Sequence, residues 1–199
     1  MKSASVFLGF APWIVFSVIA GPSTLMWAAL AALVCSLIIS VPTWVRTRST
    51  NVLEVVGLVF FAALTVAALV LDRADLMFLE ENAQLLSSLV LVVVVFGGLL
   101  VGRPFTEYYA RQTTPREYWG SATFRHINRV LTLVWGGVFL VNALSDLVVR
   151  FGGSSDVFTW VLPAIAVVAG IKITIWYPDH ASPPQDTPAE VGTGPAAAP

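Results

Sequence analysis

Six unbroken apolar runs restrict the fold of this chain more than any other feature of its sequence. They cover residues 5–21, 24–41, 52–71, 85–102, 130–149 and 158–176. A helix rises about 1.5 Å per residue, so about 20 apolar residues cross a hydrocarbon core that is about 30 Å thick. Only 12% of the residues are charged and 57% are hydrophobic, which is outside the range of an ordinary soluble domain. The runs therefore predict a polytopic membrane protein with six transmembrane helices.

The runs are too uniform for a membrane β-barrel. A barrel strand alternates apolar and polar residues over about 10 positions, whereas the stretch LVLVVVVF at residues 89–96 is apolar throughout. In lipid, every backbone N–H and C=O group must be bonded within its own segment, so such a stretch becomes a helix despite the weak helix preference of valine in water. The predicted fold class is an all-α membrane helical bundle.

The distribution of lysine and arginine predicts the orientation of the bundle. With six spans, nine of the 11 basic residues fall on one side of the membrane and two on the other. The larger set is Lys2, Arg46, Arg48, Arg103, Arg111, Arg116, Arg125, Arg129 and Lys172, and the smaller set is Arg73 and Arg150. Basic loops resist translocation. We therefore expect both termini in the cytoplasm.

The two ends of the chain need separate interpretations. Lys2, the apolar stretch behind it and the small residues of VIAG also resemble a cleavable secretory signal. However, Pro12 and Trp13 interrupt that stretch, and its removal would leave five spans and place the arginine-rich connection outside. A retained first span is therefore the favoured prediction. Residues 178–199 are rich in proline and alanine and have no periodic apolar face, which predicts a disordered cytoplasmic tail.

The connection at residues 103–129 concentrates basic and aromatic side chains. It holds five of the 11 basic residues and three of the four tyrosines. Thr114, Pro115 and Glu117 have the order of a capping box with proline at the first helical position, which predicts a short helix from that point.

Two roles fit this connection. Its rings and arginines can anchor it at the membrane interface against anionic lipid headgroups. Arginine, tyrosine and tryptophan also carry much of the binding energy in protein interfaces, so the same surface can dock a membrane or cytoplasmic partner. A net charge of -1 and the lack of a recognition motif argue against nucleic acid. The candidate interaction surface is Arg103, Tyr108, Tyr109, Arg111, Arg116, Trp119, Phe124 and Arg125.

A few polar residues lie inside the predicted spans. Asn142, Asp146 and Arg150 are spaced by four and share one helix face, so we expect an Asp146–Arg150 pair with Asn142 one turn deeper. A solute- or ion-handling site is the alternative. Glu54 and Lys172 lie at similar depth on the cytoplasmic side, where they can pair or reach the headgroups separately.

Glycine and proline add two local predictions. Gly98 and Gly102 have the GxxxG spacing that permits a close helix contact, first within the monomer and second in a dimer. Pro12 and Pro163 each remove one backbone hydrogen bond, so they should bend the first and last spans.

The sequence shows no pattern for catalysis, a cofactor or a metal. His126 and His180 are the only histidines and lack a ligand cluster, and Cys35 is the single cysteine. Phosphate-binding loops, serine elbows and redox motifs are also missing from the sequence. We therefore expect a protein that is not an enzyme and that holds neither a cofactor nor a metal.

Several short motifs follow one another in a recognisable order. The start MKSASVFLGFAPWIVFSVIA is basic and leads into a proline-containing span, and the second junction reads SVPTWVRTRSTN. Later come Arg103-Pro104 and then Pro115, Trp119 and Asn128, before a span that contains Trp135 and Phe139. Over residues 1–177 this order resembles the intracellular septation protein A family of bacterial inner-membrane proteins. The resemblance implies a role in envelope maintenance or cell division, with no catalytic residue to carry over.

These observations lead to one functional expectation with two alternatives. We expect a non-enzymatic inner-membrane protein that supports septation or the cell envelope by binding other membrane components through residues 103–129. A small-solute transporter or channel lined by Asn142 and Asp146 is the first alternative. An integral membrane enzyme acting on lipid is the second, and it would need a convergent polar cluster at the interface. A homo-oligomer is a further option that the sequence leaves open.

Overall fold

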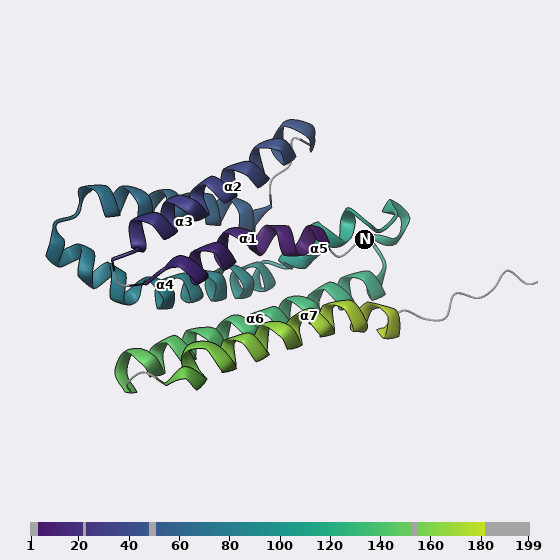
Figure 1. The fold of residues 1–199 in the computed structure, drawn as a ribbon. Helices are drawn as coiled ribbons and strands as arrows, with labels where there is room; N and C mark the ends of the chain where they lie inside the picture. The colour runs from purple at the N-terminus through teal and green to yellow at the C-terminus, as the bar shows by residue number, and fades with distance from the viewer. Residues whose placement is uncertain (1–3, 22, 48–50, 153–154, 182–199) are drawn as a thin grey trace, which may run out of the picture.

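A computed structural model describes residues 4–21, 23–47, 51–152 and 155–181, and within these ranges the chain contains helices and no strand (Figure 1). The α-helices are α1 (Ala4–Ile19), α2 (Leu25–Thr47), α3 (Val52–Val70), α4 (Arg73–Leu100), α5 (Phe105–Arg111), α6 (Ala122–Gly152) and α7 (Leu162–Ala181). A 3-10 turn, η1 (Arg116–Tyr118), precedes α6, and a π-helical turn, η2 (Val157–Val161), precedes α7. The positions predicted for Lys2 and Arg48, and residues 182–199 of the predicted tail, lie outside the described residues.

The helices have the length and composition of a multi-pass membrane protein. Five are long and apolar enough to cross a bilayer, namely α2, α3, α4, α6 and the continuous segment Val157–Ala181. Large apolar side chains point outward along them, such as Val59, Leu69 and Val93. The remaining predicted span, α1, has 16 residues and is therefore about 24 Å long, shorter than the hydrocarbon core. The structure thus confirms an all-helical architecture with several candidate membrane spans.

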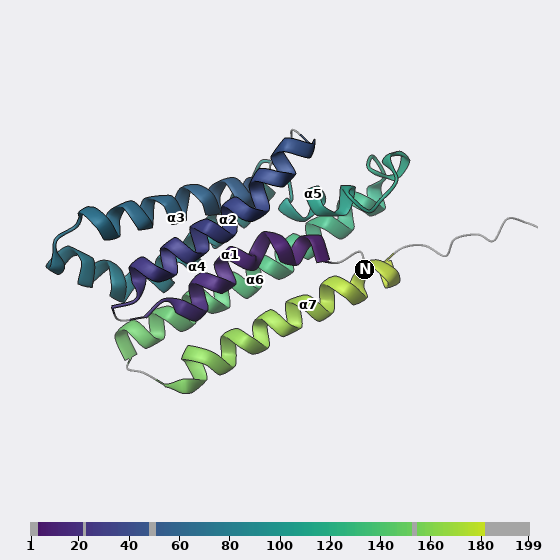
Figure 2. The same ribbon diagram turned by 45° about the horizontal axis from the view of Figure 1, so that its top comes forward.

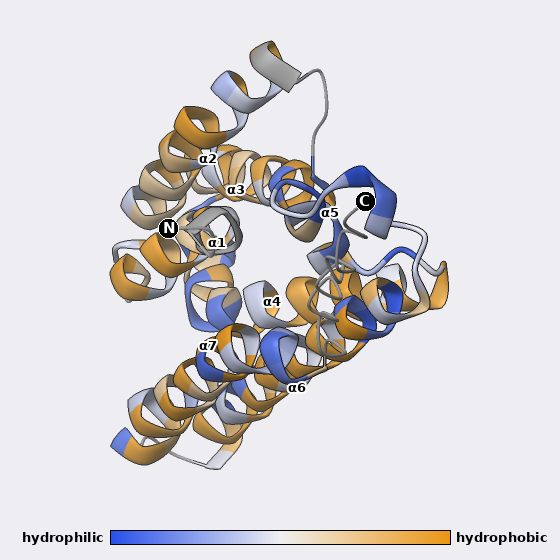
Figure 3. Ribbon diagram, turned by 90° about the vertical axis from the view of Figure 1, so that its right-hand side faces the viewer, coloured by the Kyte–Doolittle hydropathy of each residue, from blue (hydrophilic) through white to orange (hydrophobic). Residues whose placement is uncertain are grey.

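Successive long helices run in opposite directions, so their termini gather at two ends of the bundle (Figures 1 and 2). The starts of α1, α3 and α6 and the ends of α2, α4 and α7 lie at the same end as α5 and η1. We call this the α5 end and the opposite one the far end. Viewed from the α5 end, hydrophilic residues cluster in and near α5, whereas the long helices are mainly hydrophobic (Figure 3).

The core is built around α1, which joins two groups of helices. α1 packs against α2 and α3, while α6 packs against α4 and α7. Aromatic rings connect the groups, because Phe10 of α1 stacks on Trp135 of α6 with centroids 4.7 Å apart, and Trp13 stacks on Phe60 of α3 at 5.4 Å. Aromatic stacking adds to the packing of the two groups beyond the area that it buries.

Several helix boundaries differ from the predicted ones. The acidic connection before the fourth span is helical, since Asp72 accepts hydrogen bonds from the N–H groups of Ala74 and Asp75 and α4 begins at Arg73. At the other end of the chain, α7 continues to Ala181, past the predicted start of the tail at residue 178. Pro163 lies inside the continuous helical segment Val157–Ala181, directly after the π-helical turn η2, in which the N–H of Leu162 donates to the Val157 carbonyl.

Gly98 and Gly102 end α4 rather than pack it against another helix. The N–H of Arg103 donates to the Gly98 carbonyl at 2.8 Å, the N–H of Gly102 donates to Leu99, and Gly102 has φ of 70°. This is the hydrogen-bond pattern of a Schellman C-cap, which needs a left-handed residue at that position. The predicted GxxxG contact is therefore not formed within the chain, and the glycines turn the chain from α4 into α5.

Candidate functional site

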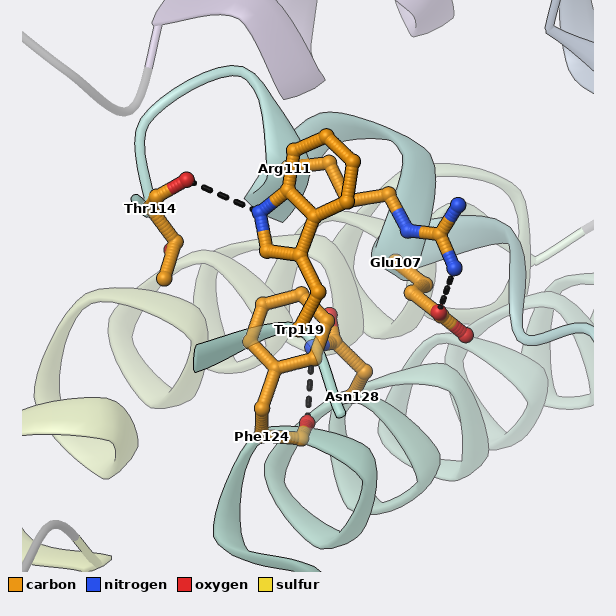
Figure 4. Close-up of polar contacts among 6 residues, drawn as sticks. All are labelled: Glu107, Arg111, Thr114, Trp119, Phe124 and Asn128. Carbon is orange, nitrogen blue, oxygen red and sulfur yellow. Dashed lines mark hydrogen bonds and ion pairs between the residues drawn. The ribbon is translucent and has the colours of Figure 1, made fainter. Parts of the chain in front are cut away.

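The helix α5 is fixed to the bundle by buried side chains. Phe105 and Tyr109 are both buried, and the Phe105 ring meets Phe10 edge-on at 5.8 Å. Thr106 Oγ1 donates to the Asn128 carbonyl of α6 at 2.8 Å and lies 2.8 Å from Thr132 Oγ1. Asn128 in turn donates from Nδ2 to the Phe124 carbonyl at 2.8 Å (Figure 4). These buried contacts therefore hold α5, and with it the polar face of the helix, in one position on the bundle.

Trp119 organises the basic residues that follow α5. Its indole N–H donates to the Thr114 carbonyl at 2.9 Å (Figure 4). The guanidinium groups of Arg111 and Arg116 lie 5.1 and 5.7 Å from its ring centroid, within the range of cation–π attraction. Arg111 also forms an ion pair with Glu107 of α5. Two arginines are thus held against one half-buried tryptophan.

The predicted short helix begins where expected, directly after Pro115, but it is only the three-residue turn η1. No side chain caps this turn, so the predicted capping box is not formed. Thr114 contributes its carbonyl to Trp119 instead.

A cavity of about 430 Å³ lies where α4, α5 and α6 come together at the α5 end. Its walls are Leu99, Gly102, Pro104, Glu107, Ala122, Arg125, His126 and Arg129. Glu107, the acidic residue in this set, is paired with Arg111, so Arg125 and Arg129 give the cavity a positive character. The arrangement suits an anionic group such as a phosphate or a carboxylate.

The structure divides the eight predicted surface residues into exposed and buried ones. Arg103, Arg111, Arg116 and Arg125 are exposed, and Tyr108 and Trp119 are half-buried. Tyr109 and Phe124, in contrast, are only 2% and 7% exposed and belong to the interior. We use the name arginine surface for Arg103, Arg111, Arg116, Trp119 and Arg125.

The predicted Asp146–Arg150 pair is not formed. Asp146 accepts a hydrogen bond from Ser88 Oγ of α4 at 2.7 Å, and Arg150 pairs with Glu81 of α4 at 3.3 Å. The reason is the length of α4, which extends past the predicted span and brings Glu81 beside the end of α6. Asn142 Oδ1 is buried without a hydrogen-bond partner in the described part of the chain. Asp146 and Arg150 therefore connect α6 to α4.

Glu54 and Lys172 do not form the pair that the sequence allowed. Ion pairs within the described ranges join Arg73 to Glu80, Arg111 to Glu107 and Arg150 to Glu81. Glu54 instead lines a small cavity between α1, α2 and α3 with Trp13, Ser36 and Ser40. Sequence reasoning missed this polar cluster, because its members come from separate spans and form no motif.

Across residues 4–21, 23–47, 51–152 and 155–181, no three His, Cys, Asp or Glu side chains gather as possible metal ligands. Comparisons with protein-family models, with curated proteins and with solved structures found no match for this chain.

Proposed function

We propose that this chain is a non-enzymatic, multi-pass protein of the bacterial inner membrane that supports septation or envelope maintenance by binding other membrane components through its arginine surface. The motif order that resembles the intracellular septation protein A family supports the process. The proposed mode of action rests on the contact of Trp119 with Arg111 and Arg116.

The side chains of this surface are suited to binding a partner. Tryptophan and arginine dominate the energetics of protein interfaces, and they do so best when their conformations are fixed before binding. Trp119 is fixed by its hydrogen bond to Thr114, and Arg111 is fixed by Glu107. The entropy lost on docking is therefore small, and a flat partner surface with acidic residues is the complement.

The charge distribution supports a cytoplasmic position for this surface. The α5 end holds the connection at residues 103–129, which contains most of the arginines, and basic segments stay on the cytoplasmic side during insertion. Division and wall-synthesis proteins of the inner membrane are accessible there. In this arrangement, the cavity lined by Arg125 and Arg129 can bind an acidic side chain of the partner or an anionic lipid headgroup.

Photocrosslinking in living cells tests the proposal. A photoreactive residue at Tyr118, which is 52% exposed and next to Trp119, should capture the same division or wall-synthesis proteins in repeated experiments. Phe78 at the far end is 67% exposed and serves as the control position, where we expect lipid alone.

Charge reversal makes the test specific. Arg116→Glu should abolish the captured protein bands, because it removes one of the two cations at Trp119 and repels an acidic partner. Arg73→Glu reverses an exposed arginine at the far end and should leave the bands unchanged. If Tyr118 captures lipid alone in the wild type, the surface is a membrane anchor and the proposed function is wrong.

A further inference from the structure

Four buried polar atoms from α1, α2 and α3 line one cavity, and none has a hydrogen-bond partner within the described ranges. They are Trp13 Nε1, Ser36 Oγ, Ser40 Oγ and Glu54 Oε2. Trp13 and Ser36 are each at most 4% exposed. A buried polar atom without a partner is costly, and most such atoms in proteins bind a protein group or water. So many in one place indicate a ligand.

A small cavity lies among these atoms. Its walls are Leu8, Gly9, Pro12, Trp13, Ser36, Ile39, Ser40, Leu53, Glu54 and Gly57, and its volume of about 10 Å³ is the room available to the centre of a water-sized particle. α1, α2 and α3 lie side by side around it (Figure 2). A volume of this size accommodates about one water molecule or one ion of similar size.

Two glycines open the space that the polar groups need. A Cβ atom at Gly57 would lie 3.3 Å from Trp13 Nε1, and one at Gly9 would lie 1.8 Å from Tyr109 Oη. Any larger residue at position 9 would therefore displace the tyrosine hydroxyl. Together these glycines let an indole N–H and a phenol approach the backbone of α1 and α3 beside the cavity.

The cavity wall contains one acidic side chain. Glu54 is the acidic residue in the wall, and no described lysine, arginine or histidine forms an ion pair with it. The groups that face it are Trp13 from α1, Ser36 and Ser40 from α2, and Tyr109 from α5. Tyr109 lies outside the spans, and burial, followed by the charge of Glu54, raises its pKa, so the phenol is neutral. Among the described residues, this carboxylate therefore has no counter-charge.

We propose that Glu54, Ser36 and Ser40 bind one monovalent cation in this cavity, either an alkali ion or a proton taken up by the Glu54 carboxylate. Carboxylate and hydroxyl oxygens are hard ligands that suit such ions. Ser36 and Ser40 are four residues apart and share one face of α2, as a common ligand requires. A single positive charge cancels that of Glu54, whereas a neutral water molecule would leave the carboxylate uncompensated.

Thermal stability tests this site without a transport assay. The full-length protein in nanodiscs of neutral lipid is melted in increasing sodium, potassium or lithium chloride, with N-methylglucamine chloride keeping the ionic strength constant. A cation that binds the folded state raises the melting temperature as its concentration rises. We expect this rise in the wild type, its loss in Glu54→Gln and a smaller rise in Ser36→Ala.

Two further variants make the result interpretable. Glu117→Gln removes an exposed carboxylate of η1 and should keep the full cation response. The double variant Ser36→Ala with Ser40→Ala keeps the charge of Glu54 and removes the neutral ligands. It gives a reading even if Glu54→Gln does not fold, and we expect a several-fold weaker apparent affinity for the cation.

The same melting curves distinguish the two sources of charge. If the ligand is a proton, the alkali ions have no effect, and the wild type gains stability with proton concentration between neutral and mildly acidic pH while Glu54→Gln does not. If the wild type and Glu54→Gln respond alike to alkali ions and to pH, the cavity holds only water and the proposal is wrong. Neither outcome affects the arginine surface, which is tested separately by crosslinking.

Discussion

At the residue scale, Thr106 shows how one hydroxyl attaches the arginine-rich segment to the bundle. Its Oγ1 contacts both Asn128 and Thr132 of α6, and the residue is only 4% exposed. Thr106→Ala leaves buried acceptors unpaired, so we expect a loss of about 1–3 kcal/mol in the free energy of unfolding. Thr113→Ala is the control, because Thr113 is exposed and bonds only within its own turn. Equal stability of both variants in equilibrium unfolding would contradict this account.

Tyr109 gives a prediction about alkaline pH. Burial, with a further contribution from the charge of Glu54, raises the pKa of its phenol above the ordinary value of about 10. The neutral phenol therefore stabilises the folded state at pH values below about 10, and this contribution is lost as the pH rises from there towards the folded pKa. We expect Tyr109→Phe to lose less stability than the wild type over that alkaline range, as measured by thermal melting.

Near neutral pH the same variant should lose at most about 0.5–1.5 kcal/mol, the contribution of one hydrogen bond, because Asn51 is the side chain that bonds the Tyr109 hydroxyl. Tyr118→Phe alters an exposed phenol and should leave the alkaline transition unchanged. A steeper alkaline loss in Tyr109→Phe than in the wild type would overturn the assignment.

At the element scale, hydrophobicity predicted the helices better than their ends. The run 52–71 matches α3 (Val52–Val70) closely, because the apolar pattern begins directly after the N-cap residue Asn51. α4 (Arg73–Leu100) and α6 (Ala122–Gly152) are much longer than their apolar runs. Their polar first turns are capped by Asp72 and Ser121, and capping does not depend on local hydrophobicity.

For the candidate site, too, the sequence predicted the segment but not its contacts. Charge and aromatic content identified the segment at residues 103–129, because those properties are local. The partners of Arg150 and Glu54 depend on which helices are neighbours, and no local pattern contains that information. Tyr109 and Phe124 were placed on the surface for the same reason, since the polar residues around them concealed that α5 and α6 turn these two rings inward.

Close packing of α4 on α6 leads to a prediction with an adjacent control. A Cβ atom at Gly136 would lie 3.0 Å from the Phe96 ring and 3.2 Å from Val95, whereas at Gly137 nothing lies within 4 Å. Gly136→Leu should therefore destabilise the bundle by about 1–3 kcal/mol through overpacking, and Gly137→Leu should be neutral or stabilising. Equilibrium unfolding of both variants in the same detergent measures the difference. Equal losses would show that α4 and α6 are not in this contact.

At the scale of the whole molecule, the antiparallel arrangement of the long helices predicts that residues of the α5 end share one side of the membrane. A variant without Cys35 can carry one new cysteine, either Gln112→Cys at the α5 end or Ala74→Cys at the far end, both exposed positions. In intact cells, a membrane-impermeant maleimide should label Ala74→Cys and not Gln112→Cys, because the arginine-rich side is expected in the cytoplasm. The reverse pattern would show that the charge distribution does not set the orientation.

The position of α7 at the edge of the bundle has a consequence for biosynthesis. Gly170 is its only buried residue within the described ranges, and it lies against Val138, while Thr174 accepts a hydrogen bond from Trp135 at 3.0 Å. None of the stacked rings around α1 comes from this helix. Since a membrane chain is synthesised from its N-terminus, α7 emerges from the ribosome last. The earlier helices can then assemble around α1 while translation continues, and α7 joins a surface of α6 that is already formed.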